Sequence, residues 1–140
     1  MTRAMRIFLD ANILFSAAKT DGAIQSLVSQ LLAAGHECWV DGYVIDEARR
    51  NIVAKAAERL PALEGLLSRV SVSAAAAALG RTESHGLPEK DRIVLAAVVA
   101  LKCDVLLTGD RTHFGRFYGR SLAGVRIHSP RSLYSELFSP

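Results

Sequence analysis

The sequence has few of the residues on which disulfide-rich, zinc-binding and membrane-spanning proteins depend. Only two of its 140 residues are cysteines, Cys38 and Cys103, and they form no close-spaced motif. Two isolated thiols in an unsecreted chain are typical of small buried hydrophobic residues, which argues against a disulfide or a metal site. No apolar run reaches the ~20 residues that span a bilayer, and the start of the chain has no signal-peptide pattern. We therefore expect a cytoplasmic protein that does not insert into a membrane.

The sequence also has few histidines and a small net charge. The four histidines are His36, His85, His113 and His128. Their positions show no metal-ligand spacing, and we expect them to be structural or exposed. The formal net charge is only +3, although five arginines crowd the last quarter of the chain. Clustered arginines are compatible with a phosphate-rich partner, but on charge alone a solvated basic surface is the better interpretation.

The composition is that of one globular domain covering residues 1–140. Half of the residues are hydrophobic, which suffices for a core, and we find neither an internal repeat nor a linker. Strands are predicted at residues 7–9, 37–40, 70–72, 104–108 and 125–127. Helices are predicted at 11–19, 23–34, 43–60, from Pro61, and at 74–79, 88–101 and 130–138, with a short helix or turn at 114–118. Because the strands are continuous apolar runs separated by helices, we expect a parallel sheet covered on both faces, a three-layer α/β/α sandwich.

Four acidic residues stand where ordinary surface acids are not expected. Asp10 ends the first predicted strand and Asp110 follows the fourth. Asp91 lies in the first turn of the most apolar helix, and Glu47 lies on the helix after the second strand. Taken singly, all but Asp10 have an ordinary interpretation as a helix-dipole partner, a turn residue or a solvated helix position. Taken together, convergence is the better interpretation, because the carboxyl ends of parallel strands share one edge.

Converging carboxylates repel one another, so some of their pKa values would be raised if no cation were present. A divalent metal removes this repulsion, and ligation by oxygen alone selects Mg²⁺ or Mn²⁺ over Zn²⁺. An ion held by a few carboxylates keeps bound waters, can activate one of them, and stabilises charge in an in-line displacement at phosphorus. The acids therefore predict metal-dependent hydrolysis of phosphodiester bonds.

An ordered set of short motifs resembles the PIN domain family over nearly the whole chain. The motifs are Phe8-Leu9-Asp10-Ala11-Asn12, Val44-Ile45-Asp46-Glu47, Lys90-Asp91-Arg92, Leu106-Leu107-Thr108-Gly109-Asp110 and Val125-Arg126-Ile127-His128-Ser129-Pro130. The resemblance implies a Mg²⁺- or Mn²⁺-dependent ribonuclease on a five-stranded, mostly parallel sheet of strand order 3-2-1-4-5. The chain is similar in size to the single-domain, toxin-type (VapC-like) members. This implies an RNA substrate, an antitoxin protein as partner, and a homodimer.

The resemblance also implies roles for the acids. Asp10, Asp91 and Asp110 would hold the metal ion, directly or through water, while Glu47 would orient or deprotonate the attacking water. Substituting Asp10 or Asp91 with Asn is expected to abolish cleavage.

Four further residues complete the expected site. Asn12 and Thr108 would fix the neighbouring carboxylates by hydrogen bonds. Arg111 and Arg116 are candidates for contact with the RNA backbone, with a solvated surface as the alternative. The chain departs from the family at positions 112–113, where many relatives carry a further acid. This departure leaves the number of metal ions open.

Two functions of other classes remain open at this point. A non-catalytic PIN-like module that binds RNA or a protein would have the same fold, although the presence of all four acids does not favour it. An aspartate-based phosphotransfer enzyme also places an aspartate at a strand end. Its usual pattern has a second acid two residues after Asp10, where Asn12 stands instead.

Overall fold

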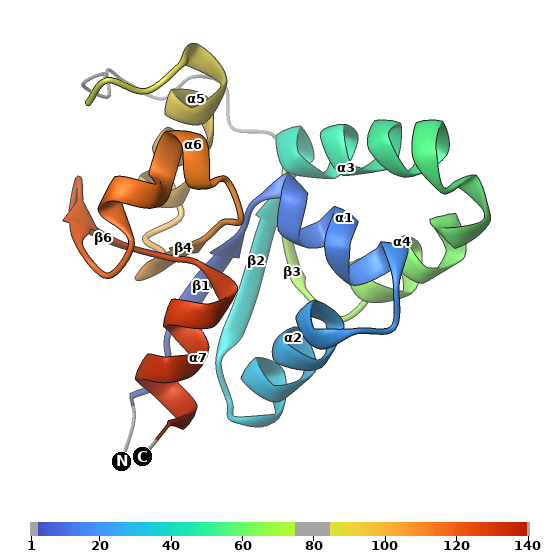
Figure 1. Cartoon of the computed structure of the whole chain (residues 1–140), viewed down its shortest axis with the longest axis horizontal. Helices are drawn as coiled ribbons and strands as arrows, with labels where there is room; N and C mark the ends of the chain where they lie inside the picture. The colour runs from blue at the N-terminus through green and yellow to red at the C-terminus, as the bar shows by residue number, and fades with distance from the viewer. Residues whose placement is uncertain (1–2, 75–84, 140) are drawn as a thin grey trace.

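The computed structural model describes residues 3–74 and 85–139 of the chain. These residues form one six-stranded sheet with helices on both sides (Figure 1). The strands are β1 Arg6–Leu9, β2 Glu37–Asp41, β3 Ser71–Ser73, β4 Val105–Leu107, β5 Ser121–Leu122 and β6 Val125–His128. Their order is β3-β2-β1-β4-β6-β5, and the only antiparallel pair among them is β5 with β6. The predicted fold class is confirmed, and the five predicted strands have the expected order.

β1 is the central strand of the sheet and pairs with β2 on one side and β4 on the other. Its residues Ile7, Phe8 and Leu9 are fully buried because helices cover both faces, which explains why they form a continuous apolar run. β2 and β3 lie to one side of β1, whereas β4 and β6 lie to the other. The direction of winding therefore reverses between β1 and β4, and α/β proteins bind ligands at the carboxyl ends of strands at such a point.

The helices form two layers, as right-handed crossovers between parallel strands require. The helices are α1 Ala11–Lys19, α2 Ala23–Ala33, α3 Gly42–Lys55, α4 Leu60–Leu67, α5 Glu89–Ala100, α6 Arg111–Phe114 and α7 Pro130–Phe138. On one side of the sheet α1 contacts α2, α3 and α4, and α7 packs against α2 and β6. α5 leads back from β3 to β4 and packs against β4 on the other side (Figure 1). This arrangement brings the amino end of α5 to the carboxyl ends of β1 and β4.

Both cysteines lie in the hydrophobic core, as expected. Cys38 and Cys103 are free, and burial raises the pKa of each thiol to about 12, so neither is a nucleophile at neutral pH. The apolar helix α5 is also largely buried, with Val94, Leu95 and Val98 at its inner face. Within the described residues, no helix has both the length and the apolar character that a membrane crossing requires.

The structure differs from the sequence prediction in four places. The short helix or turn predicted at 114–118 begins earlier, because Asp110 accepts a hydrogen bond from the N–H of His113 and caps α6 at Arg111–Phe114, and a 3₁₀ turn follows at Gly115–Phe117. The helix predicted at 43–60 is interrupted: α3 ends at Lys55, Ala56 adopts φ −157° and ψ 57°, and a 3₁₀ turn leads into α4. This break lets α4 fold back against α1. The sheet has a sixth strand, β5, because Ala123 and Gly124 both have positive φ (53° and 80°) and form a tight hairpin turn. The helix predicted at 74–79 lies, from residue 75 on, outside the described residues.

Candidate active site

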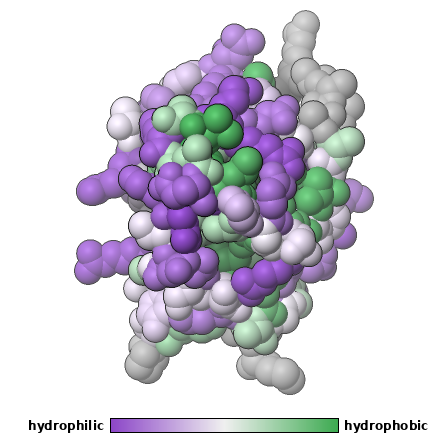
Figure 2. Space-filling model, turned by 90° about the vertical axis from the view of Figure 1, so that its right-hand side faces the viewer, coloured by the Kyte–Doolittle hydropathy of each residue, from purple (hydrophilic) through white to green (hydrophobic). Residues whose placement is uncertain are grey.

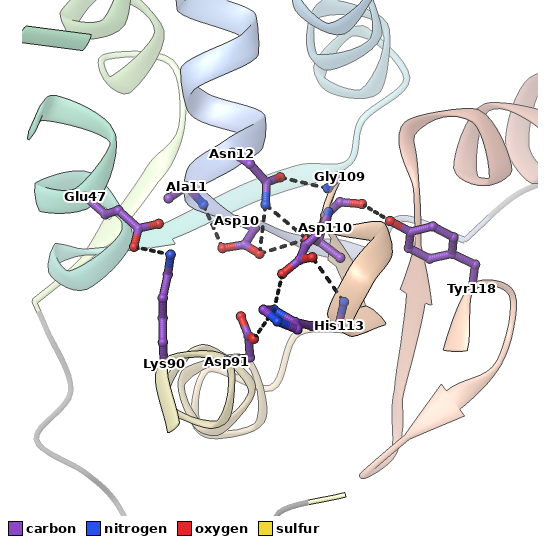
Figure 3. Close-up of polar contacts among 11 residues, drawn as sticks. Asp10, Ala11, Asn12, Glu47, Lys90, Asp91, Gly109, Asp110, His113 and Tyr118 are labelled. Carbon is purple, nitrogen blue, oxygen red and sulfur yellow. Dashed lines mark hydrogen bonds and ion pairs between the residues drawn. The ribbon is translucent and has the colours of Figure 1, made fainter. Parts of the chain in front are cut away.

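The carboxyl ends of β1 and β4 bring the four predicted acids together (Figure 3). Asp10 directly follows β1 and caps α1, and Asp110 follows β4 and caps α6. Asp91 lies in the first turn of α5, and Glu47 lies on α3. The backbone N–H of Asp10 donates to the carbonyl of Leu107 at 3.0 Å, so the two strand ends are direct neighbours. We call Asp10, Glu47, Asp91 and Asp110 the acidic cluster.

Asp10 is one of the two almost fully buried acids of this cluster and is only 4% exposed. Its Oδ1 accepts a hydrogen bond from the N–H of Ala11 at 2.8 Å, and its Oδ2 accepts one from the hydroxyl of Thr108 at 2.8 Å. Burial nevertheless raises the pKa of Asp10 to about 6, and the charges of Glu47 and Asp91 act in the same direction. A buried carboxylate with such a strongly shifted pKa is a candidate functional group.

Thr108 and Asn12 hold the ends of the two strands together. The buried hydroxyl of Thr108 donates to Asp10 and accepts from the backbone N–H of Asp110 at 3.2 Å. Asn12 Nδ2 lies 3.4 Å from Asp10 Oδ2 and 3.3 Å from Thr108 Oγ1, while its Oδ1 accepts from the N–H of Gly109 at 2.7 Å. A Cβ at position 109 would approach Asn12 Oδ1 to 3.3 Å, so glycine suits this close contact. The expected hydrogen bonds to the carboxylates are therefore in place.

Asp91 presents a buried oxygen that lacks a hydrogen bond. The residue is 3% exposed, and its Oδ2 accepts no hydrogen bond from any residue in the described ranges. Burial raises the pKa of Asp91; Asp110 and Glu47 add to this effect, whereas His113 and Lys90 oppose it. Burying a carboxylate oxygen without a donor is costly, unless a cation meets it.

His113 inserts its imidazole between two of the acids (Figure 3). Its backbone N–H donates to Asp110 Oδ1 at 3.1 Å, and its Nδ1 lies 2.7 Å from Asp110 Oδ2. The same Nδ1 lies 2.8 Å from Asp91 Oδ2. The sequence analysis did not predict this role for His113, because the four histidines show no metal-ligand spacing. The available signal was its position three residues after Asp110, which is one helical turn.

Glu47 reaches the cluster from α3 and pairs with Lys90, the residue that precedes Asp91. Lys90 Nζ lies 2.7 Å from Glu47 Oε1, and the Glu47 side chain is the more buried of the two. The hydrogen bond to Glu47 raises the pKa of Lys90, so the lysine is charged at neutral pH. One lysine among four acids leaves a surplus of negative charge. The sequence analysis assigned no role to Lys90, although this residue belongs to the motif Lys90-Asp91-Arg92.

Arg111 borders an open cavity beside the acidic cluster. The cavity has a volume of about 390 Å³, and Arg111, Arg131, Tyr118 and Gly109 are among the residues that line it. Tyr118 donates its hydroxyl to the carbonyl of Thr108 at 3.1 Å, which fixes the wall nearest the cluster. Both arginines are exposed, and neither forms an ion pair with a residue of the described segments. The cavity therefore offers positive charge next to the acids.

Arg116, the other predicted RNA contact, is engaged within the protein. Its Nη2 donates to the backbone carbonyl of His85 at 2.6 Å, and its guanidinium lies 4.7 Å from the centre of the Phe117 ring. A Cβ at Gly86 would come within 2.6 Å of the same Nη2. In this structure Arg116 thus holds the segment that leads into α5, which places Asp91.

The donor set of the acidic cluster fits a divalent cation. Ligand atoms of Asp91, Asp110 and His113 all lie within 4.8 Å of one another, and the unsatisfied Asp91 oxygen belongs to this group. Asp10, predicted as a third ligand, adjoins these residues, and both of its oxygens accept hydrogen bonds. Each carboxylate oxygen has a second lone pair, so these hydrogen bonds leave Asp10 able to bind a metal. Its direct ligation stays a prediction.

Several solved structures share this fold. A chain of the VapBC2 complex of Rickettsia felis, crystallised with a DNA fragment from the promoter, has a TM-score of 0.67 and 17% identity, and the match covers 89% of the present chain and 98% of that chain. A chain of the DNA-bound VapBC complex of Salmonella typhimurium has a TM-score of 0.62 and 16% identity, over 90% and 98% of the two chains. VapC20 of Mycobacterium tuberculosis, described as a toxin that cleaves the sarcin-ricin loop, has a TM-score of 0.58 and 14% identity, over 86% and 98%.

These neighbours are described as two VapBC complexes and one VapC toxin, and the likeness extends over most of the chain. The fold expected from the resemblance to PIN domains is therefore confirmed, with one strand more than expected. At 14–17% identity the likeness concerns the fold. No family model matches the sequence, and no curated protein matches it.

Proposed function

We propose that this protein is a divalent-metal-dependent ribonuclease and the toxin component of a toxin–antitoxin pair. The observation that carries the proposal is the convergence of four acids at the carboxyl ends of β1 and β4 (Figure 3). The proposal is supported by the fold, which is shared with a VapC toxin described as cleaving the sarcin-ricin loop.

In this proposal Asp91 and Asp110 hold the metal ion, and Asp10 completes the ligand set directly or through water. A bound Mg²⁺ or Mn²⁺ would polarise the phosphate and supply a nucleophilic water at neutral pH. Thr108 and Asn12 keep the carboxylate of Asp10 in one orientation, because together they contact its Oδ2 from two sides. Such support fixes ligand geometry before the metal binds.

Glu47 is the residue that we assign to the attacking water. It lies on α3, on the side of the cluster away from Asp110, and its Oε1 is held by Lys90 at 2.7 Å (Figure 3). The carboxylate can accept a proton from water while Lys90 fixes its orientation. We propose that Lys90 is a positioning residue in this step.

The RNA backbone would approach along the side of the cluster where Arg111 and Arg131 line the cavity. Guanidinium groups suit phosphate because they present several donors in one plane. Neither arginine is neutralised by an ion pair within the described parts of the chain, so both are available to a phosphate. Arg111 therefore remains a proposed RNA contact, whereas the contacts of Arg116 favour a structural role.

An antitoxin partner, a homodimer and a cytoplasmic location belong to the same proposal. Two of the fold neighbours were crystallised as VapBC complexes. Figure 2 shows the face on which α3 and α4 lie, where apolar side chains gather among polar ones. Exposed apolar groups of this kind mark surfaces that a partner can cover. Molar mass in solution, with and without the product of an adjacent small gene, tests this part.

The phosphotransfer alternative receives less support from the geometry. Enzymes of this kind usually carry a second acid two residues after the nucleophilic aspartate, and Asn12 stands at that position here. The Oδ1 of Asn12 accepts a hydrogen bond from the N–H of Gly109 at 2.7 Å, so the side chain links the two strand ends. An amide cannot give or take the proton that this second acid would transfer.

Cleavage of labelled RNA by the purified protein tests the proposed function. We expect cleavage with Mn²⁺ or Mg²⁺ and none with EDTA, because the acids need the cation. Asp91→Asn should reduce the rate by at least about a hundredfold, since it removes a charge from the metal site. Asp46→Asn is the matched control, because Asp46 is exposed and lies outside the cluster. Cleavage that persists in EDTA, or in Asp91→Asn, contradicts the proposal.

A further inference from the structure

Ion pairing alone does not explain the position of the His113 imidazole. Nδ1 lies 2.7 Å from Asp110 Oδ2 and 2.8 Å from Asp91 Oδ2, so a single nitrogen faces two carboxylates. One nitrogen carries at most one proton and can donate one strong hydrogen bond. That hydrogen bond is made with Asp110.

Asp91 is left without a donor as a result. Its Oδ2 is buried and takes no hydrogen bond from any residue of the described segments, although His113 Nδ1 is within reach. The arrangement holds two anionic oxygens and one imidazole nitrogen around a common point (Figure 3). Three such atoms are satisfied at once by a cation that accepts electron pairs from all of them.

We propose that His113 Nδ1 is a direct ligand of the metal ion, together with Asp91 and Asp110, and that this nitrogen gives the site a preference for Mn²⁺ over Mg²⁺. The inference rests on the metal-binding part of the proposed function. Carboxylates suit both ions, but Mg²⁺ is the harder ion and gives up its bound water reluctantly, so an added imidazole nitrogen should raise the affinity for Mn²⁺ more than that for Mg²⁺. The ligand set is thus mixed, where the sequence predicted oxygen alone.

The spacing of the three atoms agrees with this assignment. Neighbouring ligands of an octahedral ion, each about 2.1 Å from it, lie roughly 3 Å apart. The two distances from Nδ1, 2.7 and 2.8 Å, are close to that value. The ligand atoms of all three residues lie within 4.8 Å of one another, so the three side chains can meet at one ion.

The backbone of α6 presents the ring for this purpose. Asp110 caps the helix by accepting from the N–H of His113 at 3.1 Å, so ligand and cap belong to one turn. The His113 side chain is 41% exposed, whereas that of Asp91 is 5% exposed. An ion can reach the imidazole from solvent and then meet the buried oxygen. The site therefore has an entry path.

Electron paramagnetic resonance of bound Mn²⁺ tests the inference without reference to catalysis. Wild-type protein loaded with Mn²⁺ should show magnetic coupling to an imidazole nitrogen, and His113→Gln should lose it. The dissociation constant for Mn²⁺, measured by titration calorimetry, should rise at least about tenfold in His113→Gln. His85→Gln is the matched control, because it removes a partly exposed imidazole outside the cluster and should retain the coupling.

A second variant measures the preference between the ions. His113→Asp gives a site with oxygen ligands only, so its preference for Mn²⁺ should weaken. The dissociation constant for Mg²⁺ divided by that for Mn²⁺ should therefore be smaller than in the wild type. Mn²⁺ bound with no nitrogen coupling, or with coupling unchanged in His113→Gln, overturns the inference and leaves the proposed nuclease intact. Nitrogen-coupled Mn²⁺ in a protein that cleaves no RNA supports the inference and contradicts the proposed function. Failure to bind Mn²⁺ overturns both.

Discussion

Two clusters in this molecule use carboxylates and a histidine in opposite ways. The carboxy-terminal cluster consists of Arg126 and His128 from β6 with Ser132 and Glu136 from α7. His128 Nδ1 lies 2.8 Å from Ser132 Oγ, and its Nε2 lies 2.9 Å from Glu136 Oε2. Arg126 donates to the other oxygen of Glu136 at 2.7 Å. The single acid is matched by a cation, both ring nitrogens have partners, and the cluster joins α7 to the sheet.

The acidic cluster has surplus charge instead. Four acids face one lysine and one histidine, burial raises the pKa of both Asp10 and Asp91, and Asp91 Oδ2 has no hydrogen bond from the described residues. A site arranged for stability would pair these groups, as the carboxy-terminal cluster does. This difference is the one expected if the acidic cluster binds a cation, as we propose, at a cost to the stability of the metal-free protein.

The largest expected effect comes from removing the buried charge of Asp10. Because the pKa of Asp10 rises from 3.8 to about 6 on folding, its charge costs about 3 kcal/mol at pH 7.5. Asp10→Asn removes this cost, but its amide has one acceptor oxygen where Asp10 has two, so it loses the hydrogen bond made by one of them. With about 1 kcal/mol lost in this way, the free energy of unfolding should increase by about 2 kcal/mol. Urea denaturation in EDTA measures the gain, and cleavage by the same variant should be abolished.

The pH dependence of that gain has a definite sign. In the wild type, native Asp10 binds a proton between pH 3.8 and about 6 whereas the unfolded chain does not. Wild-type stability from this group therefore falls as pH rises through that window and is constant above it. The advantage of Asp10→Asn should be full at pH 7.5 and should shrink toward pH 4. An advantage that is the same at both pH values would contradict the buried charge as its cause.

The carboxy-terminal cluster should respond to pH in the opposite direction. Burial lowers the pKa of His128 below its usual 6.5, although Glu136 opposes the shift. The contribution of His128 to the free energy of unfolding is full above pH 6.5. It is lost as pH falls below 6.5, because the unfolded chain then binds a proton that the folded protein does not. His128→Gln should cost about 1 kcal/mol at pH 7.5 through one lost hydrogen bond. The difference from the wild type should narrow at pH 5.

The rate of RNA cleavage by His128→Gln tests whether the carboxy-terminal cluster has a role in catalysis. His128→Gln should cleave RNA at the wild-type rate at a temperature where both proteins are folded, because His128 contacts Ser132 and Glu136 and none of the four acids. A loss of cleavage comparable to that of Asp91→Asn would show that the carboxy-terminal cluster acts in catalysis. The two clusters would then share a catalytic role, and the carboxy-terminal cluster would not serve stability alone.

Most of the fold followed from local sequence patterns. The apolar runs at β1 and β4 predicted buried strands, and the helix beginning at Pro130 was predicted with both of its ends. β5 escaped prediction because its two residues carry no periodic signal and depend on the turn at Ala123 and Gly124. The break at Ala56 escaped because nothing in the local sequence opposes helix there, and packing of α4 on α1 decides it.

The acids of the candidate site were predictable because strand ends converge in any parallel sheet. The cations beside them were not. Lys90 and Glu47 lie on different helices, and the two residues are 43 positions apart in the sequence. His113 meets Asp91 only because the chain turns into α6 at Asp110. Both contacts depend on tertiary structure, which no spacing rule in one sequence contains.

The smallest expected effect tests whether the carboxy-terminal cluster depends on its exposed ion pair. Arg126 and Glu136 are 46% and 40% exposed at their side chains, so water screens the attraction between them. Arg126→Gln should lower the free energy of unfolding by no more than about 0.5 kcal/mol, with less effect at high salt. Glu136 would still accept a hydrogen bond from His128. A loss above about 1 kcal/mol that persists in 1 M salt would mean that Arg126 also orients Glu136 for His128, and that the two contacts act as one unit.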